Sequence, residues 1–318
     1  MEQITRRTVL LAVLLFLVIV LYFVWESIDR VAVRTWVVDV DNPGPMPEMA
    51  DPELAVPWLS DRESFGIAFS GGGTRSASAS LGELRALHNL GWLDRARYIS
   101  SNSGGSWVTV PYTWLPAAID EQRFLGDYIR PDKLTDDNLH PAAMDPQSMG
   151  WAIHNANTIS EFYKIGRGDE AYSDVVGSIF LKPFGLHDNK KFFTFHKAAL
   201  ENSLQANREL NAQNFQVVER QRPYLIVTSV MIGQQMSDDP EEYYPIDMTP
   251  LYTGIRGRFE LDKDGETVVV GGGYVESFGY DSYEPLRRAR NGRSTVRLTG
   301  ALLRLSLIHI SEPTRLQV

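Results

Sequence analysis

The residues best suited to chemistry form a turn rich in serine and glycine at residues 101–105. A serine hydroxyl attacks a carbonyl carbon only when a base takes its proton and donors stabilise the oxyanion. A sharp turn from a strand into a helix exposes such a hydroxyl and needs small residues two positions to either side. Ser101 and Gly105 take those positions around Ser103, with serine where glycine is usual. The pattern predicts a nucleophilic Ser103 in a turn supported by Gly104 and Gly105; a plain strand-to-helix loop is the alternative.

A second glycine run, Gly71-Gly72-Gly73, lies about 30 residues before Ser103. Glycines let successive backbone N–H groups turn toward one point without Cβ clashes, as oxyanion holes and anion-binding loops both require. A nucleotide-binding loop is the competing interpretation. However, no Lys-Ser or Lys-Thr pair follows the glycines, and the spacing of a dinucleotide fingerprint is not met. The run therefore favours an oxyanion hole over a nucleotide site.

Short apolar runs separated by glycines indicate how these two turns are positioned. Residues 65–69 and 98–100 are typical of buried strands, and residues 75–90 carry leucines at helical spacing. A second helix is expected over residues 107–115. Strand, glycine turn, helix, strand, tight turn and helix in this order predict a βαβα unit with a parallel sheet. Later elements are also expected: a helix over 197–208, a strand over 223–230 and a hairpin over 259–270 that turns at 263–265.

Two segments together resemble the catalytic domains of patatin-like proteins and cytosolic phospholipases A2. They are Ser70-Gly71-Gly72-Gly73-Thr74-Arg75-Ser76 and Ser101-Asn102-Ser103-Gly104-Gly105-Ser106-Trp107. The likeness covers about residues 62–300 and includes a weaker match at residues 244–252. It implies an α/β fold with a central mixed sheet and flanking helices. It also implies a serine hydrolase of phospholipid or lysophospholipid esters that needs no cofactor and no metal.

The resemblance assigns roles to individual residues. Ser103 would attack the ester carbonyl as part of a Ser–Asp dyad, and the N–H groups of Gly72 and Gly73 would hold the oxyanion. Arg75 would face the lipid phosphate or steady the site. A surface position at a helix start is the plain interpretation of Arg75, but a cation there opposes the positive end of the helix. The charge therefore favours a role in substrate binding.

The dyad aspartate is not evident in the sequence. Asp264-Gly265 is the only Asp-Gly pair, and it lies in a polar stretch typical of a hairpin turn. The glycine run at 271–273 contains no aspartate. Residues 306–318 resemble a translated sequencing adapter, so we expect the native chain to diverge near Arg304. The sequence predicts that the dyad aspartate lies beyond that point and that this chain is inactive as written.

The first 25 residues predict a membrane anchor. Residues 8–25 contain no charge, no proline and no glycine, and 18 helical residues span about 27 Å, close to a bilayer core. The segment ends in bulky residues without a signal-peptide cleavage site. Arg6 and Arg7 favour a cytoplasmic N-terminus with the large domain on the other side, whereas Arg30 and Arg34 oppose that orientation. The side of the catalytic domain therefore stays open.

Composition excludes several classes of function. The chain of 318 residues carries a net charge of −9, which argues against nucleic acid as the main partner. It has no cysteine, so disulfides, thiolate catalysis and Cys-ligated zinc are excluded. The six histidines include no H-E-x-x-H motif or other metal-ligand spacing. A Ser–His triad stays open, because triad members are distant in sequence.

These observations predict four segments: an anchor (1–25), a linker (26–60), an acyl hydrolase domain incomplete at its C-terminus (61–305) and a non-native tail (306–318). The expected protein is held on a single-pass anchor with membrane lipid as its substrate. Two alternatives remain. One is a general carboxylesterase, and the other is an inactive, membrane-tethered module that binds lipid with the same fold.

Overall fold

A computed structural model describes residues 13–21, 30–38, 56–156, 175–188, 191–208, 210–232, 243–279, 287–288 and 293–297. The strands are β1 (Arg30–Val37), β2 (Glu63–Phe69), β3 (Ala96–Ser101), β4 (Phe192–Thr194), β5 (Phe215–Val217), β6 (Tyr224–Ile232), β7 (Tyr243–Met248), β8 (Tyr252–Lys263), β9 (Glu266–Glu276), β10 (Arg287–Arg288) and β11 (Arg293–Arg297). The labelled α-helices are α3 (Gly73–Asn89), α4 (Trp92–Arg95), α5 (Ser103–Thr113), α6 (Glu121–Leu125), α7 (Asp136–Leu139), α8 (Met149–Asn155) and α11 (Lys197–Ala206). Short 3₁₀ turns lie at 131–133, 141–143, 182–184, 212–214 and 277–279.

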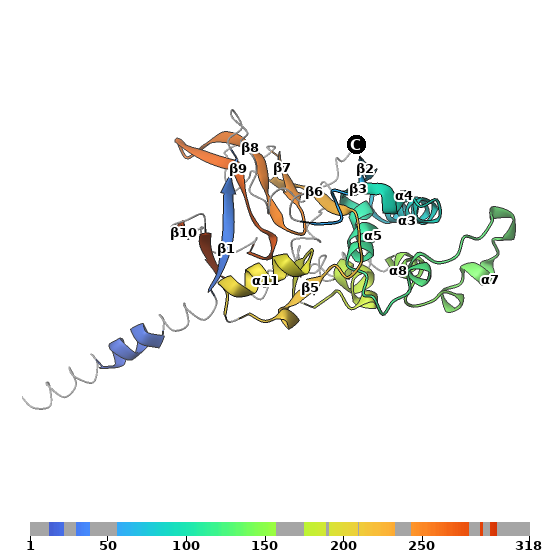
Figure 1. The fold of residues 1–318 in the computed structure, drawn as a ribbon, viewed down its shortest axis with the longest axis horizontal. Coiled ribbons are helices and arrows are strands. Elements are labelled where there is room, and N and C mark those ends of the chain that lie inside the picture. Colours follow the sequence, from blue (N-terminus) through green and yellow to red (C-terminus); the bar gives the residue numbers. More distant parts are fainter. Residues whose placement is uncertain are drawn as a thin grey trace, which may run out of the picture.

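The largest element is a mixed sheet of nine strands in the order β10-β11-β1-β9-β8-β7-β6-β3-β2. Strands β2, β3 and β6 are parallel to one another, and the remaining pairs in this sheet are antiparallel. Figure 1 shows the sheet as the centre of the molecule, with helices beside it. The expected α/β fold with a central mixed sheet and flanking helices is confirmed. Strands β4 and β5 form a separate parallel pair.

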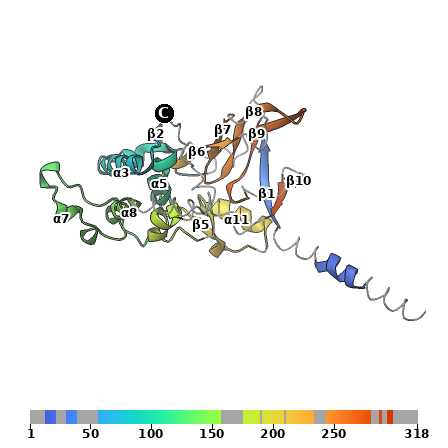
Figure 2. The same ribbon diagram turned by 180° about the vertical axis from the view of Figure 1, so that it is seen from behind.

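Helices α3 and α5 pack against each other on one face of the parallel strands. The connections β2–α3–β3 and β3–α5–β6 step across the sheet in the same direction, and right-handed crossovers in one direction place both helices on one face. The core there contains Leu84 of α3, Val108 of α5, Ile99 of β3 and Val227 of β6, each with 0% of its surface exposed. Figures 1 and 2 show α3, α5, α7 and α8 toward the β2 end, with β1 and β10 at the opposite end. This packing fixes the starts of α3 and α5 relative to the strand ends before them.

The predicted elements around the two glycine motifs are present. The strand expected at 65–69 is β2, the strand at 98–100 is β3, and the helix at 75–90 is α3. The hairpin at 259–270 belongs to β8 and β9. The second helix begins at Ser103 itself rather than at residue 107 as expected. Glycines at positions 104 and 105 suggested a continuing turn, but they occupy the first turn of the helix.

The segment expected as a linker contains a strand that the sequence analysis did not predict. Strand β1 pairs with β9 on one side and β11 on the other. Asn207, the C-cap of α11, accepts from the Ala32 N–H at 2.6 Å and donates to its carbonyl at 3.0 Å. Arg34 pairs with the buried carboxylate of Glu276 at 2.5 Å. Residues 30–37 are therefore part of the sheet, while the proposed domain boundaries stay predictions.

Residues 13–21 of the predicted anchor form a helix whose apolar side chains are exposed, such as Phe16 at 65%. The remainder of residues 8–25 lies outside the described residues. No helix within the described part of the chain has both the length and the apolar character needed to cross a membrane. The anchor and the membrane location stay predictions.

Candidate active site

Ser103 lies at a sharp turn from β3 into α5. A single residue, Asn102, separates the end of the strand from the first helical residue. Ser103 has a φ of 47°, in the left-handed region that costs a residue with a Cβ about 1–2 kcal/mol. The turn is closed by the Gly105 N–H, which donates to the Asn102 carbonyl at 3.0 Å. This is the backbone geometry that the sequence predicted for a nucleophile, and the Ser103 residue is only 8% exposed.

The glycine run 71–73 lies directly against this turn. A Cβ on Gly71 would lie 2.9 Å from the Ser103 Cβ, and one on Gly104 would lie 2.0 Å from the Gly73 carbonyl oxygen. A Cβ on Gly105 would meet the Ser70 carbonyl oxygen at 2.8 Å. The two backbones therefore touch where only glycine fits. The structure brings together the two motifs that the sequence analysis paired.

The strand register explains why the motifs meet. Phe69, the last residue of β2, pairs with Ser101, the last residue of β3. Both strands are parallel, so their carboxyl ends lie at the same edge of the sheet. The glycine loop and the Ser103 turn each leave that edge at the same level, and α3 and α5 begin side by side.

The starts of α3 and α5 concentrate unpaired backbone donors at this edge. Gly72 is the N-cap of α3 with a φ of 140°, and Gly73 is its first residue with a φ of 63°. Among the described residues, no side chain caps α3 or α5, and neither first turn carries an acidic residue. The first N–H groups of a helix have no partner within the helix, and they carry a partial positive charge. Gly72 and Gly73 therefore lie where an oxyanion would be favoured.

Two further residues near the glycines differ in exposure. Arg75, the third residue of α3, is exposed, and no ion pair to it forms within the described part of the chain. Ser76 is buried, and its hydroxyl donates to the Ser70 carbonyl, which braces the loop from the next turn of the helix. The sequence analysis missed this bracing role of Ser76. The sequence shows small hydroxyl residues repeated along α3, but the packing of a helix against its neighbours explains that pattern equally well.

Comparisons with known proteins find structural neighbours only. No protein-family model matches the chain, and no curated protein matches it. Three solved structures of human GIVD cytosolic phospholipase A2 are similar in structure, each at a TM-score of 0.35. The complex with methyl γ-linolenyl fluorophosphonate and terbium chloride is 15% identical, with 78% of this chain and 30% of that chain covered.

The other two structures give similar values. The complex with methyl γ-linolenyl fluorophosphonate alone is 16% identical and covers 77% of this chain and 28% of that one. The third structure is 14% identical and covers 74% and 27%. This chain thus spans less than a third of the length of these neighbours.

A base for Ser103 is not found in the described part of the chain. The structure gives the Ser103 hydroxyl no hydrogen-bond partner among the described residues. Asp264 and Gly265 have φ values of 53° and 81° between the paired residues Lys263 and Glu266. Two successive positive φ values are those of the predicted type I′ hairpin turn, so turn geometry explains this Asp-Gly pair. The predicted dyad aspartate beyond Arg304 lies outside the described residues.

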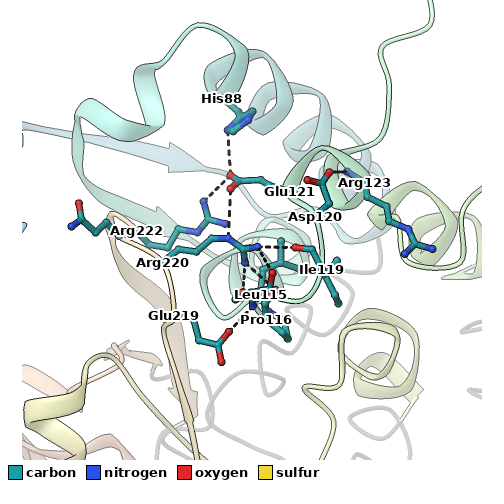
Figure 3. A network of polar contacts seen from close by, with 12 residues as sticks. His88, Leu115, Pro116, Ile119, Asp120, Glu121, Arg123, Glu219, Arg220 and Arg222 are labelled. Atoms are coloured by element: carbon teal, nitrogen blue, oxygen red, sulfur yellow. Dashed lines mark hydrogen bonds and ion pairs between the residues drawn. The ribbon is translucent and has the colours of Figure 1, made fainter.

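A separate charged cluster lies at the other end of α5, and Figure 3 shows how its side chains converge on Glu121. Arg222 Nη1 lies 2.7 Å from Glu121 Oε1, and His88 Nδ1 lies 3.2 Å from the same oxygen. The Arg222 guanidinium also covers the Tyr112 ring at 3.8 Å. Tyr112 is near the C-terminus of α5, so about 14 Å of helix separates this cluster from Ser103.

The pKa of Glu121 follows from these contacts. Burial raises it, but the hydrogen bond and charge of Arg222, with smaller contributions from Tyr112 and His88, bring the net pKa below its ordinary value of 4.5. Arg220 adds hydrogen bonds to the carbonyls of Leu115, Pro116 and Ile119. The cluster ties the segment before β6 to the connection between α5 and α6. No group of three or more His, Asp or Glu side chains able to hold a metal occurs among the described residues.

Proposed function

We propose that the protein is a serine acyl hydrolase in which Ser103 is the nucleophile and the backbone N–H groups of Gly72 and Gly73 bind the oxyanion. One observation carries the proposal. Ser103 occupies a strained left-handed turn in backbone contact with a glycine loop, at the point where two uncapped helices begin. A loop that only connects a strand to a helix can form without a strained residue and without contact to a glycine loop. Strained residues instead cluster at functional sites, so the strain at Ser103 favours a catalytic role.

The chemistry proceeds through an acyl-Ser103 intermediate. Ser103 Oγ forms a bond to the ester carbonyl carbon while its proton passes to a carboxylate, and the C=O electron pair moves onto oxygen. The N–H groups at the start of α3 stabilise that oxyanion. When the C–O bond to the leaving alcohol breaks, the alcohol takes up the proton. Water then hydrolyses the acyl ester, which frees the fatty acid and restores the hydroxyl. The carboxylate is the aspartate of a Ser–Asp dyad, expected beyond Arg304.

Phospholipids and lysophospholipids are the proposed substrates. Arg75 is the one charged residue in the first turn of α3, and it is exposed on the helix that begins at Gly73. A guanidinium there suits a phosphodiester next to the reacting ester, because planar N–H donors bind phosphate oxygens in pairs. The predicted anchor over residues 8–25 would hold the domain at a lipid surface.

Activity-based labelling tests the proposal. The full chain, with any residues that its gene encodes after Arg304, is treated with a fluorophosphonate, and the modified peptide is identified by mass spectrometry. We expect label on Ser103 and none after Ser103→Ala. The exposed Ser78 of α3 provides a matched control, and Ser78→Ala should label like the parent. Label that persists in Ser103→Ala would refute the nucleophile.

Two outcomes would select the alternatives. If Ser103 reacts with the probe, equal hydrolysis of short soluble esters and of phospholipid vesicles by the unlabelled enzyme would identify a general carboxylesterase. Vesicle binding without any labelling or hydrolysis would identify an inactive lipid-binding module.

A further inference from the structure

Three buried hydroxyls span the turn that carries Ser103. Ser101 ends β3, and Ser106 and Thr109 lie on the first two turns of α5. They are 4%, 1% and 0% exposed. Ser101 Oγ lies 2.7 Å from Thr109 Oγ1, and the Ser106 hydroxyl donates to Ser101 Oγ at 3.0 Å. This hydroxyl chain joins the residue two positions before Ser103 to residues three and six positions after it.

Beyond its packing against the glycine loop, the turn has few other hydrogen bonds that hold its conformation. Asn102, the N-cap of α5, makes no side-chain capping hydrogen bond, and a single backbone hydrogen bond closes the turn. Ser103 meanwhile stays in the left-handed region at a φ of 47°. A strained residue persists only where the surrounding structure determines its conformation. The hydroxyl chain supplies side-chain contacts that cross the strained residue.

Ser101 links the other two hydroxyls, because its own hydroxyl can form hydrogen bonds with both. A serine hydroxyl offers one proton and two acceptor sites. Ser101 accepts from Ser106 and shares a further hydrogen bond with Thr109. A glycine at position 101, the residue usual in such turns, would leave both partner hydroxyls buried without this contact. A buried polar group that loses its partner costs more than the bond contributes.

We propose that Ser101, Ser106 and Thr109 are positioning residues that hold the Ser103 turn, and so its Oγ, in the attacking arrangement. The inference rests on the proposed role of Ser103 as nucleophile. None of the three side chains is assigned contact with substrate. They act through the backbone between β3 and α5. The serine at position 101 therefore has a function that the usual glycine cannot perform.

The first test compares two threonines of α5 in the same protein as the labelling experiment, with any residues that its gene encodes after Arg304. Thr109→Val removes the hydroxyl that meets Ser101, whereas Thr113→Val removes a buried hydroxyl that donates only to the Thr109 carbonyl. We expect the fluorophosphonate labelling rate of Ser103 and the kcat for a soluble ester to fall about fivefold to tenfold in Thr109→Val, with KM unchanged. Thr109→Ser should restore both, and Thr113→Val should stay within about twofold of the parent.

The second test restores the usual motif. Ser101→Gly should also lower the labelling rate by about fivefold to tenfold, although it recreates the common sequence pattern. Ser106→Ala keeps the Ser101–Thr109 contact and should give a smaller decrease. It is the variant to measure if Thr109→Val does not fold. Equal decreases in Thr109→Val and Thr113→Val, or no decrease in Ser101→Gly, would overturn the proposal.

Hydrogen exchange separates this inference from the proposed function. Amide exchange in peptides covering residues 102–106 reports on the turn whether or not the protein hydrolyses esters. We expect faster exchange there in Thr109→Val than in Thr113→Val. Label that persists in Ser103→Ala would defeat the proposed function alone, and the exchange data would still decide whether the hydroxyls hold the turn. Unchanged exchange in Thr109→Val overturns the inference.

Discussion

Replacement of Gly104 by alanine tests whether the contact between the two glycine motifs builds the site. The new Cβ would lie 2.0 Å from the Gly73 carbonyl oxygen and 2.8 Å from the Gly73 carbonyl carbon. Because both partners are backbone, no side-chain rotation relieves the overlap, and the starts of α3 and α5 must separate by about 1 Å or more. Such overpacking costs about 1–3 kcal/mol of stability. A shift of about 1 Å at a reacting group can lower the rate by about 100-fold.

The matched control is Gly82→Ala, a second helical glycine, whose added Cβ would meet no atom within 4 Å apart from its chain neighbours and the backbone of its own helix. Alanine in an open helix position is favoured over glycine by about 1 kcal/mol, so this variant should be more stable and equally reactive. Urea unfolding gives the stability change, and the fluorophosphonate labelling rate of Ser103 gives the chemical change. Gly104→Ala that labels at the parent rate would refute the reasoning, because the glycine contact would then be irrelevant to the nucleophile. If Gly82→Ala is also destabilised, the loss of stability in Gly104→Ala could not be attributed to the contact with Gly73.

Three further predictions follow from the charged residues. Glu121→Gln leaves the 4%-exposed Arg222 without its counter-charge. Because the Glu121 side chain is 20% exposed, the expected loss of stability is at the lower end for a buried pair, about 3 kcal/mol, measured by thermal and urea unfolding. Because the pKa of folded Glu121 lies below its unfolded value of 4.5, its stabilisation is present above that pH and is lost as the pH falls through the folded value. The free energy of unfolding of the Gln variant should therefore fall less steeply than that of the parent as the pH is lowered. Equal slopes at acid pH would contradict the assignment. Asp264→Asn should keep both stability, within about 0.5 kcal/mol, and labelling, since Asn-Gly suits the same turn; lost labelling would instead make Asp264 catalytic. Arg75→Ala should raise KM for phospholipid about tenfold while hydrolysis of an uncharged ester is unchanged, and equal effects on both substrates would remove the phosphate role.

The pairing of the two glycine motifs could be predicted because each lies at the end of a short apolar strand. Two parallel strands joined by a helix bring their carboxyl ends to one edge, so a turn after each strand must lie near the other. In the structure, the last residues of the two strands, Phe69 and Ser101, are paired, as this reasoning requires. The hairpin turn at Asp264 was equally predictable, because an Asp-Gly pair between two strand-like runs has few other conformations.

Other features depend on contacts between distant parts of the chain. Strand β1 carries β-branched residues at alternate positions, Val31, Val33, Thr35 and Val37, which the sequence analysis did not use. Its partners β9 and β11 lie more than 200 residues away, so the local sequence does not show what it pairs with. The pairing of His88 with Glu121 joins residues on α3 and α6, and neither position has a sequence signal for the other. The hydroxyl chain at Ser101 was hidden for a different reason. Serine at a position that requires a small residue is explained by size alone until the Thr109 contact is seen.

Strand β1 also changes what the predicted anchor would do. A linker over residues 26–60 would let the catalytic domain move up to about 120 Å from the membrane, at about 3.4 Å for each extended residue. In the structure β1 begins at Arg30, so only four residues separate it from Trp25 at the end of the predicted span. Those residues reach at most about 17 Å. In sheet order, five steps lead from β1 to β3, which is about 24 Å at the usual spacing between strands. If residues 8–25 cross a bilayer, the Ser103 turn is therefore held within a few tens of ångströms of the lipid headgroups. The substrate must then reach the sheet edge, because the domain cannot move to a distant substrate.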